Sequence, residues 1–370
     1  MSSPQSLARL AKEPIGSADP ARGDAHRWER GIVVLWSAAA ALLLFIASLG
    51  LGAPAAEDNP IELRKLVPPS DPLYQQDLSF DPRFARTALQ YVRSSDPVLI
   101  DNLARLPAAE HLLNHARQFD YDVPKDTPLS LVRHLLAPSP ELQAQVDEVE
   151  RSLAFFTGPL LEDPHWVNDV LYYLPAGFRF HGSLFLTFGY DIGVALAPNA
   201  SLNGASRRFD GKPRELLYYA IHELHHVGVM TYQPPPRIAD IKTCADVLRL
   251  VDYSTELEGL AVYAARTRRA AEHALLADPD YVALESGEQM RILEQRYDEQ
   301  YRYLKGRGNQ PADKEALAVI DRMSSGDRLW YRVGAMMAGR VEAGFGHAAL
   351  VSLIVKPHPT LVETYEKMRR

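Results

Sequence analysis

The stretch Ile221-His222-Glu223-Leu224-His225-His226-Val227 decides how this chain is interpreted, because it contains the spacing His-Glu-x-x-His. Residues four apart lie on one face of an α-helix. His222 and His226 can therefore point their imidazoles at one metal ion, and Zn²⁺ is the ion that this pattern typically binds. Glu223 lies about 100° round the helix, where it can take a proton from a water at the metal. His225 falls outside this geometry.

The residues around this motif predict an amphipathic helix. Pro213 suits the first position of a helix. Residues 216–227 contain no helix breaker, and Gly228 followed by three prolines at 234–236 predicts the end. The face opposite the two histidines is apolar, so the helix can pack its back into a core and present the histidines to a cleft. The alternative is a helix whose histidines and glutamate form a solvated face.

A third metal ligand must come from elsewhere, because a catalytic zinc site takes three protein ligands and keeps a fourth position for water. Residues 255–263, Thr-Glu-Leu-Glu-Gly-Leu-Ala-Val-Tyr, supply candidates. With both motifs the chain resembles the gluzincin class of zinc metallopeptidases, whose second helix carries a glutamate ligand, often within Glu-Gly-x-Ala. This resemblance implies that Glu258 is the third ligand. Glu256 is the alternative ligand, and Glu258 also fits a helix-capping role beside Thr255.

A tyrosine downstream is a candidate for a further catalytic role. Gluzincins commonly place a tyrosine or histidine beside the oxyanion of the reaction, whose developing charge needs a donor besides the metal. Here the arrangement Tyr331-x-x-Gly334-x-x-Met337 resembles a segment found after the zinc motif in some poorly characterised bacterial zinc-peptidase families. The resemblance implies that Tyr331 donates to the oxyanion. The alternative is a core aromatic residue with its hydroxyl at the surface.

Composition limits the partners of the chain. Its 370 residues, with 46% hydrophobic and 24% charged residues, can bury a sizeable core in one large or two ordinary domains. The net charge is −7 and the basic residues form no long run, so nucleic acid is not an expected partner. The single cysteine, Cys244, excludes an internal disulfide and a zinc cluster built from cysteines. A peptide or protein substrate is expected, and the oligomeric state does not follow from the sequence.

The N-terminal region predicts a membrane anchor. Residues 1–30 are polar with several basic residues, and residues 31–52 form an uncharged run long enough to span a bilayer as a helix. Basic residues precede this run and acidic ones follow it, so the tail is expected in the cytoplasm and the remaining chain outside, in the periplasm of a Gram-negative cell. The alternative is a cleaved signal peptide, because residues 53–55, Ala-Pro-Ala, resemble a cleavage site. Residues 53–77 are rich in proline and acidic residues and predict a linker.

Beyond the linker the pattern predicts two subdomains. Residues 78–177 carry apolar residues at helical spacing between proline-containing breaks, which predicts a helical N-terminal subdomain. In the second subdomain, residues 178–370, the short apolar runs 183–188 and 194–197 predict a hairpin or a pair of neighbouring strands. A small sheet at this point is similar to gluzincins, where an edge strand holds extended peptide by backbone pairing. The alternative is that these strands only cover the core.

The resulting prediction is a mainly α fold with a small β-sheet (α+β), in which a single N-terminal transmembrane helix precedes a gluzincin-like zinc peptidase domain. It implies a membrane-anchored peptidase that hydrolyses peptide bonds with Zn²⁺ on the three ligands named above and with Glu223 as general base. Two alternatives stay open. One is a zinc amidase acting on a non-peptide envelope component, and the other is an envelope protein that keeps the motif without catalysis.

Overall fold

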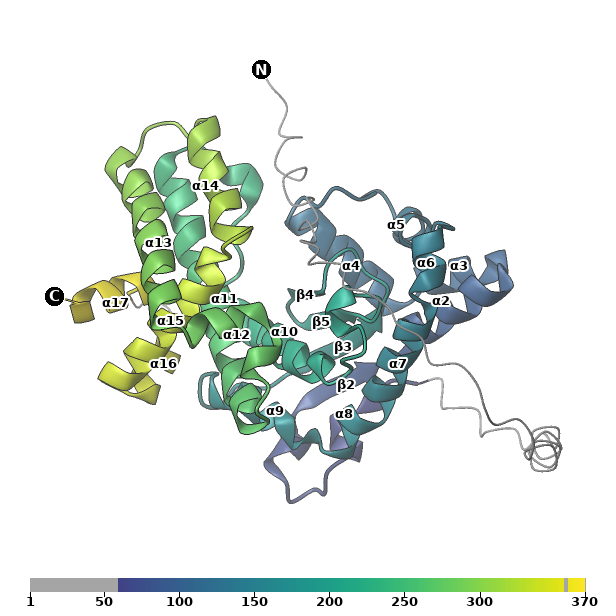
Figure 1. Cartoon of the computed structure of the whole chain (residues 1–370). Coiled ribbons are helices and arrows are strands. Elements are labelled where there is room, and N and C mark those ends of the chain that lie inside the picture. The colour runs from purple at the N-terminus through teal and green to yellow at the C-terminus, as the bar shows by residue number, and fades with distance from the viewer. Residues whose placement is uncertain (1–58, 356–358, 370) are drawn as a thin grey trace, which may run out of the picture. The chain divides into compact units, whose positions relative to one another are not determined.

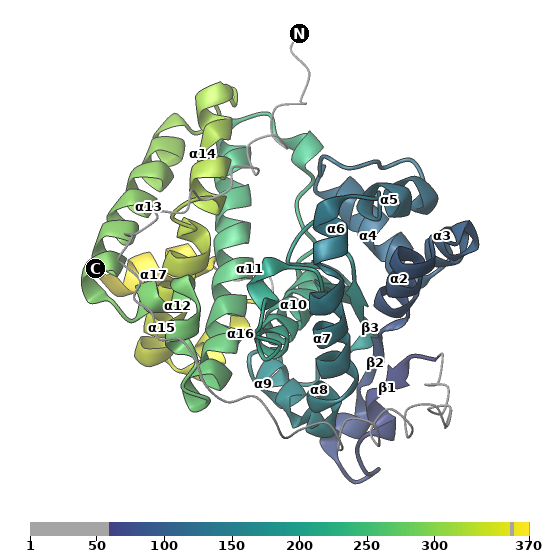
Figure 2. The same cartoon turned by 45° about the vertical axis from the view of Figure 1, so that its right-hand side comes forward.

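The computed structural model describes residues 59–355 and 359–369, which form helices and a small sheet (Figure 1 and Figure 2). The strands are β1 (Ile61–Glu62), β2 (Asp77–Asp81), β3 (His181–Thr187), β4 (Gly193–Leu196) and β5 (Asn199–Asn203). The helices before β3 are α2 (Arg83–Ser94), α3 (Pro97–Ala104), α4 (Pro107–Gln118), α5 (Pro128–Leu135), α6 (Pro140–Ala144), α7 (Val146–Thr157), α8 (Pro159–Glu162) and α9 (Val167–Tyr172). The helices after β5 are α10 (Glu215–Tyr232), α11 (Cys244–Ala271), α12 (Pro279–Leu284), α13 (Gly287–Arg307), α14 (Lys314–Ser324), α15 (Leu329–Phe345), α16 (His347–Ser352) and α17 (Leu361–Arg369). Short 3-10 helices are η1 (Leu63–Lys65), η2 (Pro72–Gln75), η3 (Pro164–Trp166), η4 (Arg207–Phe209), η5 (Ile238–Asp240) and η6 (Leu275–Ala277).

The sheet is mixed and has the strand order β1-β2-β3-β5-β4. Strands β2, β3 and β5 are parallel, whereas β1 pairs with β2, and β4 with β5, in antiparallel fashion. The last pair places Val194 opposite Ser201, and β4 is an edge strand. The predicted pairing of residues 183–188 with residues 194–197 is therefore wrong. The chain turns back after β4, and the next strand, β5, takes the place beside β3.

Strand β1 lies within the residues expected to form a linker. The segment that follows it packs into the core, where Leu63 and Leu73 are fully buried. Strand β2 then pairs along its whole length with β3, from Asp77 opposite His181 to Asp81 opposite Phe185. The folded part of the chain thus begins earlier than the proline-rich composition predicts, because apolar residues between the prolines are buried.

Helix α10 lies between the sheet and the C-terminal helices. It packs against β4 and β5 and also against α11, while α4 contacts the same two strands. In Figure 1 the strands β4 and β5 lie between α10 and α4. Helices α11, α13, α14 and α15 pack against one another, most extensively α11 against α15. The motif helix therefore has the edge of the sheet as one neighbour and α11 as the other.

A buried ion pair joins the start of α10 to the end of α11. Arg269 donates to both carboxylate oxygens of Glu215, at 3.0 and 2.5 Å. Its guanidinium lies 4.2 Å from the ring centroid of Tyr218 and 4.6 Å from that of Tyr281. Both ends of the ion pair are buried, and a two-point contact with stacking offsets much of the desolvation cost of such a pair. This contact fixes the two helices relative to each other.

The predicted fold class needs correction in its transmembrane part. No helix within residues 59–355 and 359–369 is long and apolar enough to cross a membrane. The longest of them, α11 and α13, carry charged residues along their length, and α10 packs into the protein interior. The run at residues 31–52, on which that prediction depended, lies outside the described residues. The described part of the chain is a mostly helical fold with a small mixed sheet.

Candidate metal centre

Helix α10 brings His222, Glu223 and His226 to its junction with α11. The helix ends at Tyr232, between Gly228 and the three prolines that were together expected to end it, so it continues for one turn past the glycine. A Cβ on Gly228 would come within 2.4 Å of the side chain of Leu174. The glycine therefore serves close packing inside the helix and does not end it.

The side chain of Glu258, on α11, meets both histidines. Its Oε2 lies 3.2 Å from Nε2 of His222 and 3.1 Å from Nε2 of His226. One ligand atom from each of these residues lies within 4.8 Å of the others. No other group of three His, Cys, Asp or Glu side chains converges in this way among the residues that the structure describes. The side chains of His222 and Glu258 are 13% and 18% exposed, so this point can be reached from solvent.

The chemistry of this donor set fits a zinc ion. Two imidazole nitrogens and one carboxylate oxygen are ligands that zinc accepts in catalytic sites. Burial opposes ionisation of Glu258, but the charge of His226 and hydrogen bonds from both histidines hold the pKa of Glu258 well below its usual value. Burial likewise opposes protonation of His226, and the Glu258 carboxylate outweighs it and raises the pKa of His226. A cation would replace the proton that links imidazole and carboxylate, since metal ligands bind in their deprotonated form.

Glu256, the alternative ligand, points elsewhere. Its Oε1 accepts a hydrogen bond from Nε2 of Gln233 at 2.7 Å, and its Oε2 accepts one from the backbone N–H of Leu361 at 3.2 Å. Two residues along a helix correspond to about 200° of rotation, so Glu256 and Glu258 cannot both face the histidines. In the structure Glu258 is the one that does.

A capping role for Glu258 is also wrong. The N-cap of α11 is Thr243, whose hydroxyl oxygen accepts from the backbone N–H of Asp246 while the Asp246 side chain accepts from that of Thr243. Thr255 lies in the middle of the helix and shares a hydrogen bond of 2.8 Å with the hydroxyl of Tyr297. The helix begins well before Thr255, so no helix start is left there for Glu258 to cap.

Two glycines let α11 and α15 approach closely beside the site. A Cβ on Gly259 would lie 2.5 Å from the carbonyl carbon of Gly334, and a Cβ on Gly334 would lie 2.6 Å from the backbone oxygen of Thr255. Both contacts are with backbone atoms, which cannot move aside as a flexible side chain can. One glycine belongs to the Glu-Gly-x-Ala motif of Glu258 and the other to the Tyr-x-x-Gly motif of Tyr331. The two motifs thus meet at this helix crossing.

We expect Gly334→Ala to destabilise the fold by about 1–3 kcal/mol or more, because the added methyl group forces two helix backbones apart. Zinc affinity should fall as well, since Glu258 lies on one of these helices. Thermal unfolding and zinc titration measure the two effects. Gly306→Ala on α13 is the matched control, because a Cβ there would meet nothing within 4 Å, and alanine favours a helix over glycine. A Gly334→Ala protein that unfolds at the wild-type temperature would contradict the close helix crossing.

Glu223 lies beside the ligands and against the edge strand. A Cβ on Gly193, in β4, would come within 2.5 Å of Oε1 and 2.8 Å of Cγ of Glu223, so any larger residue there would force the Glu223 side chain to move. Burial raises the pKa of Glu223 to about 8. A cation on the ligands would lower that pKa again, because a nearby positive charge favours the carboxylate. Gly193 could not be singled out from the sequence, since a glycine between two apolar runs predicts only a turn.

Tyr331, on α15, lies near the ligands. Burial first, and then the charge of Glu258, raises the pKa of Tyr331 far above its usual value. The hydroxyl therefore keeps its proton, and it is close enough to Glu258 for the carboxylate to disfavour its ionisation. The ring is covered by the guanidinium of Arg328, whose Cζ lies 3.6 Å from the ring centroid. Tyr331 is thus a partly buried proton donor near the candidate metal site.

Asp191 is a further carboxylate near the site that the sequence does not single out. It precedes β4, and it accepts hydrogen bonds from the hydroxyl of Tyr121 at 2.6 Å and from the backbone N–H of Ile192 at 2.8 Å. Burial raises the pKa of Asp191, and the charges of Arg328 and Glu258 act on it in opposite directions. No ligand spacing marks Asp191 in the sequence, because the fold of the sheet brings it to the site.

This geometry defines a class of site. A metal-dependent hydrolase needs ligands that converge on one point and a carboxylate beside them that can act as a base. A family model described as "Putative zinc dependent peptidase (DUF5700)" matches residues 165–370, and the chain belongs to this family. The chain matches no curated protein and no solved structure. The family description gives Zn²⁺ as the cofactor, hydrolysis as the reaction and peptides as the substrates.

Proposed function

We propose that the chain is a gluzincin-type zinc metallopeptidase with His222, His226 and Glu258 as the metal ligands. The observation that carries the proposal is the convergence of these three ligand atoms beside a buried glutamate, Glu223, that lies outside the cluster. A site that only held zinc would need no such glutamate. Bound zinc supplies a Lewis acid that makes water nucleophilic near neutral pH and polarises a carbonyl oxygen.

Glu223 acts as the general base in this proposal. Its carboxylate takes a proton from the attacking water and passes the proton to the amine that leaves. The residue is 5% exposed, so bulk water does not compete for the carboxylate. Its contact with the backbone at Gly193 restricts where Oε1 can lie, and a restricted base needs little reorganisation when the reaction begins.

The free edge of β4 is the proposed place for the substrate backbone. The backbone N–H of Asn203 donates to the oxygen of Ile192, directly opposite, at 2.9 Å. Hydrogen-bonded and non-hydrogen-bonded residue pairs alternate along an antiparallel pair of strands, so this bond shows which residues of β4 bond to β5. Gly193 and Ala195 are the non-hydrogen-bonded positions, so their backbone N–H and C=O groups face away from β5. An extended peptide can pair with such groups as an added strand, which would bring its backbone next to Glu223.

Zinc-dependent cleavage of peptides tests this function. The purified protein should cleave a subset of bonds in a mixed peptide library, as measured by mass spectrometry. A chelator should stop cleavage, and one equivalent of zinc should restore it. Non-peptide amides are the comparison, because a zinc amidase could use the same ligands. Cleavage of these amides without cleavage of peptides would contradict a peptidase, and zinc-loaded protein that cleaves neither would contradict an enzyme.

We expect Tyr331→Phe to lower kcat by about a hundredfold or more at unchanged zinc content, because it removes only the hydroxyl that would donate to the oxyanion. Tyr263→Phe is the matched control. It also removes a tyrosine hydroxyl, but that hydroxyl donates to Glu342 at 2.5 Å. Steady-state kinetics and metal analysis of both variants give the answer. Near-normal turnover of Tyr331→Phe would leave Tyr331 as a packing residue only.

A further inference from the structure

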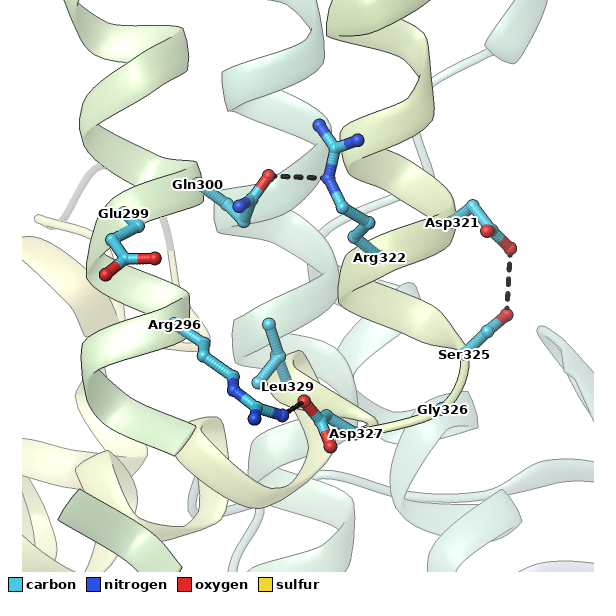
Figure 3. Close-up of a pocket in the computed structure, with 9 residues that line it drawn as sticks. All are labelled: Arg296, Glu299, Gln300, Asp321, Arg322, Ser325, Gly326, Asp327 and Leu329. Atoms are coloured by element: carbon cyan, nitrogen blue, oxygen red, sulfur yellow. Dashed lines mark hydrogen bonds and ion pairs between the residues drawn. The ribbon is translucent and has the colours of Figure 1, made fainter. Parts of the chain in front are cut away.

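Arg328, the residue before α15, has an unusual backbone conformation next to the site. Its φ of 49° and ψ of 52° lie in the left-handed region, which residues other than glycine occupy at a cost. The preceding loop holds it there: the backbone N–H of Arg328 donates to the oxygen of Ser325 at 3.0 Å, and Oγ of Ser325 donates to Asp321 at 3.0 Å. Asp327 pairs with Arg296, and both residues line a pocket of about 310 Å³ (Figure 3). Backbone strain that neighbouring contacts maintain in this way often occurs at functional sites.

The guanidinium of Arg328 is anchored through one of its nitrogens. Nε donates to Oδ1 and Oδ2 of Asp280 at 3.2 and 2.9 Å. The group also lies over the ring of Tyr331, so two contacts restrict its position. Neither Nη1 nor Nη2 forms a hydrogen bond to another residue in the described part of the chain. The Arg328 side chain is 25% exposed, and neither Nη is among the buried polar atoms without a partner in the described part of the chain, so both can reach solvent.

This cation lies beside the candidate metal ligands. The guanidinium covers the ring of Tyr331, and Gly334, one turn after Tyr331 on α15, lies against Gly259 beside the ligand Glu258 on α11. Burial lowers the pKa of Arg328, whereas the carboxylates of Asp280 and Glu258 raise it. The guanidinium is therefore near the junction of α11 and α15 that carries Glu258.

We propose that Arg328 binds a carboxylate of the peptide substrate next to the bond that is cleaved. A guanidinium presents a planar fork of N–H groups that matches the two oxygens of a carboxylate, and the Nη groups of Arg328 are not used by Asp280. The carboxylate is either the C-terminus of the peptide or an acidic side chain, which offer the same chemistry. The inference rests on the proposed peptidase function and adds a substrate class to it: peptides with an anionic group beside the scissile bond.

Arg332 provides a matched control for this role. Its Nε donates to the same carboxylate of Asp280, at 2.8 Å, and its side chain is 15% exposed. It lies one helical turn further along α15, however, and among the described residues its guanidinium covers no aromatic ring. Substitution of either arginine removes a hydrogen bond to Asp280. An effect seen only with the Arg328 variant therefore does not come from the loss of that bond.

Paired substrates test the inference on the full-length, zinc-loaded protein. A peptide that the wild type cleaves is taken from the mixed library and synthesised with a C-terminal carboxylate or amide, and with Glu or Gln at each position flanking the cleaved bond. In one of these pairs we expect the wild type to have a kcat/KM about tenfold or more higher for the anionic peptide, mainly through a lower KM. Arg328→Gln should reduce this ratio to about one. Arg332→Gln should keep the ratio.

The pair that responds identifies the source of the carboxylate. The inference would be overturned if Arg328→Gln kept the wild-type ratio of kcat/KM between the anionic and the neutral peptide. It would also be overturned if the wild type cleaved peptides but preferred the anionic one in no pair. A zinc-loaded wild type that cleaves no peptide would overturn the proposed function and the inference together. Melting temperature and zinc content report whether each variant is folded. Arg328→Lys, which keeps the charge but not the fork, should lose part of the ratio, and it replaces Arg328→Gln should that variant not fold.

Discussion

Glu223→Gln is expected to retain zinc and to lose about 10²–10⁴-fold in kcat, because an amide cannot accept the proton that a general base takes. The ligands His222, His226 and Glu258 are unchanged in this variant. Glutamine has nearly the same size as glutamate, so it fits the narrow space against Gly193. The loss should therefore reflect chemistry and not packing. Metal analysis and kinetics on a peptide that the wild type cleaves measure the two expected outcomes.

Two results with this variant would contradict the role of Glu223. Full activity of the zinc-loaded protein would show that another group takes the proton. Loss of zinc would place Glu223 among the ligands, whereas in the structure it is not one of the three residues whose ligand atoms converge. An unchanged melting temperature is the control that the variant has folded as the wild type does.

Glu258→Ala is expected to lower zinc affinity more than about a hundredfold, because removal of even an indirect partner of a ligand costs about 10–100-fold. Glu256→Ala is the matched control on the same helix. Its carboxylate is 2% exposed and accepts hydrogen bonds from Gln233 and Leu361. Its removal takes the acceptor from the buried backbone N–H of Leu361, whereas Gln233 keeps the carbonyl oxygens of Leu353 and Ile354. The fold should lose about 1–3 kcal/mol of stability, with zinc affinity little changed. Zinc titration and thermal unfolding of both variants separate these effects.

The opposite pattern would contradict the ligand assignment. If Glu256→Ala released zinc and Glu258→Ala did not, α11 would have to be rotated by about 200° from its position in the structure. Such a rotation would also remove the contact between Gly259 and Gly334. The zinc titration therefore tests the packing of α11 as well as its ligand.

The arrangement on α10 could be predicted from the sequence because it is local. Residues four apart on a helix share a face whatever the helix packs against. The choice between Glu258 and Glu256 was harder, since both lie in the middle of a 28-residue helix and differ only in the face they occupy. That face is set by the close contact with α15 at Gly259, and from the sequence only the resemblance to Glu-Gly-x-Ala favoured Glu258.

The surroundings of the site could not be predicted to the same degree, because they depend on contacts between distant residues. Short apolar runs predict strands, but the order β3-β5-β4 depends on how the chain turns after β4. Asp191 and Gly193 reach the site only through that order. Arg328 in the sequence is a charged residue before an apolar helix. Its contact with Tyr331 is local, but its contact with Asp280 follows from the packing of α12 against α15.

Anomalous X-ray diffraction at the zinc absorption edge, from crystals of the zinc-loaded protein, tests the central claim most directly. We predict one anomalous peak at about 2.0–2.2 Å from Nε2 of His222, Nε2 of His226 and a carboxylate oxygen of Glu258. A peak at another group of residues, or zinc-loaded crystals with no peak beside the two histidines, would contradict the claim that these three residues hold the metal.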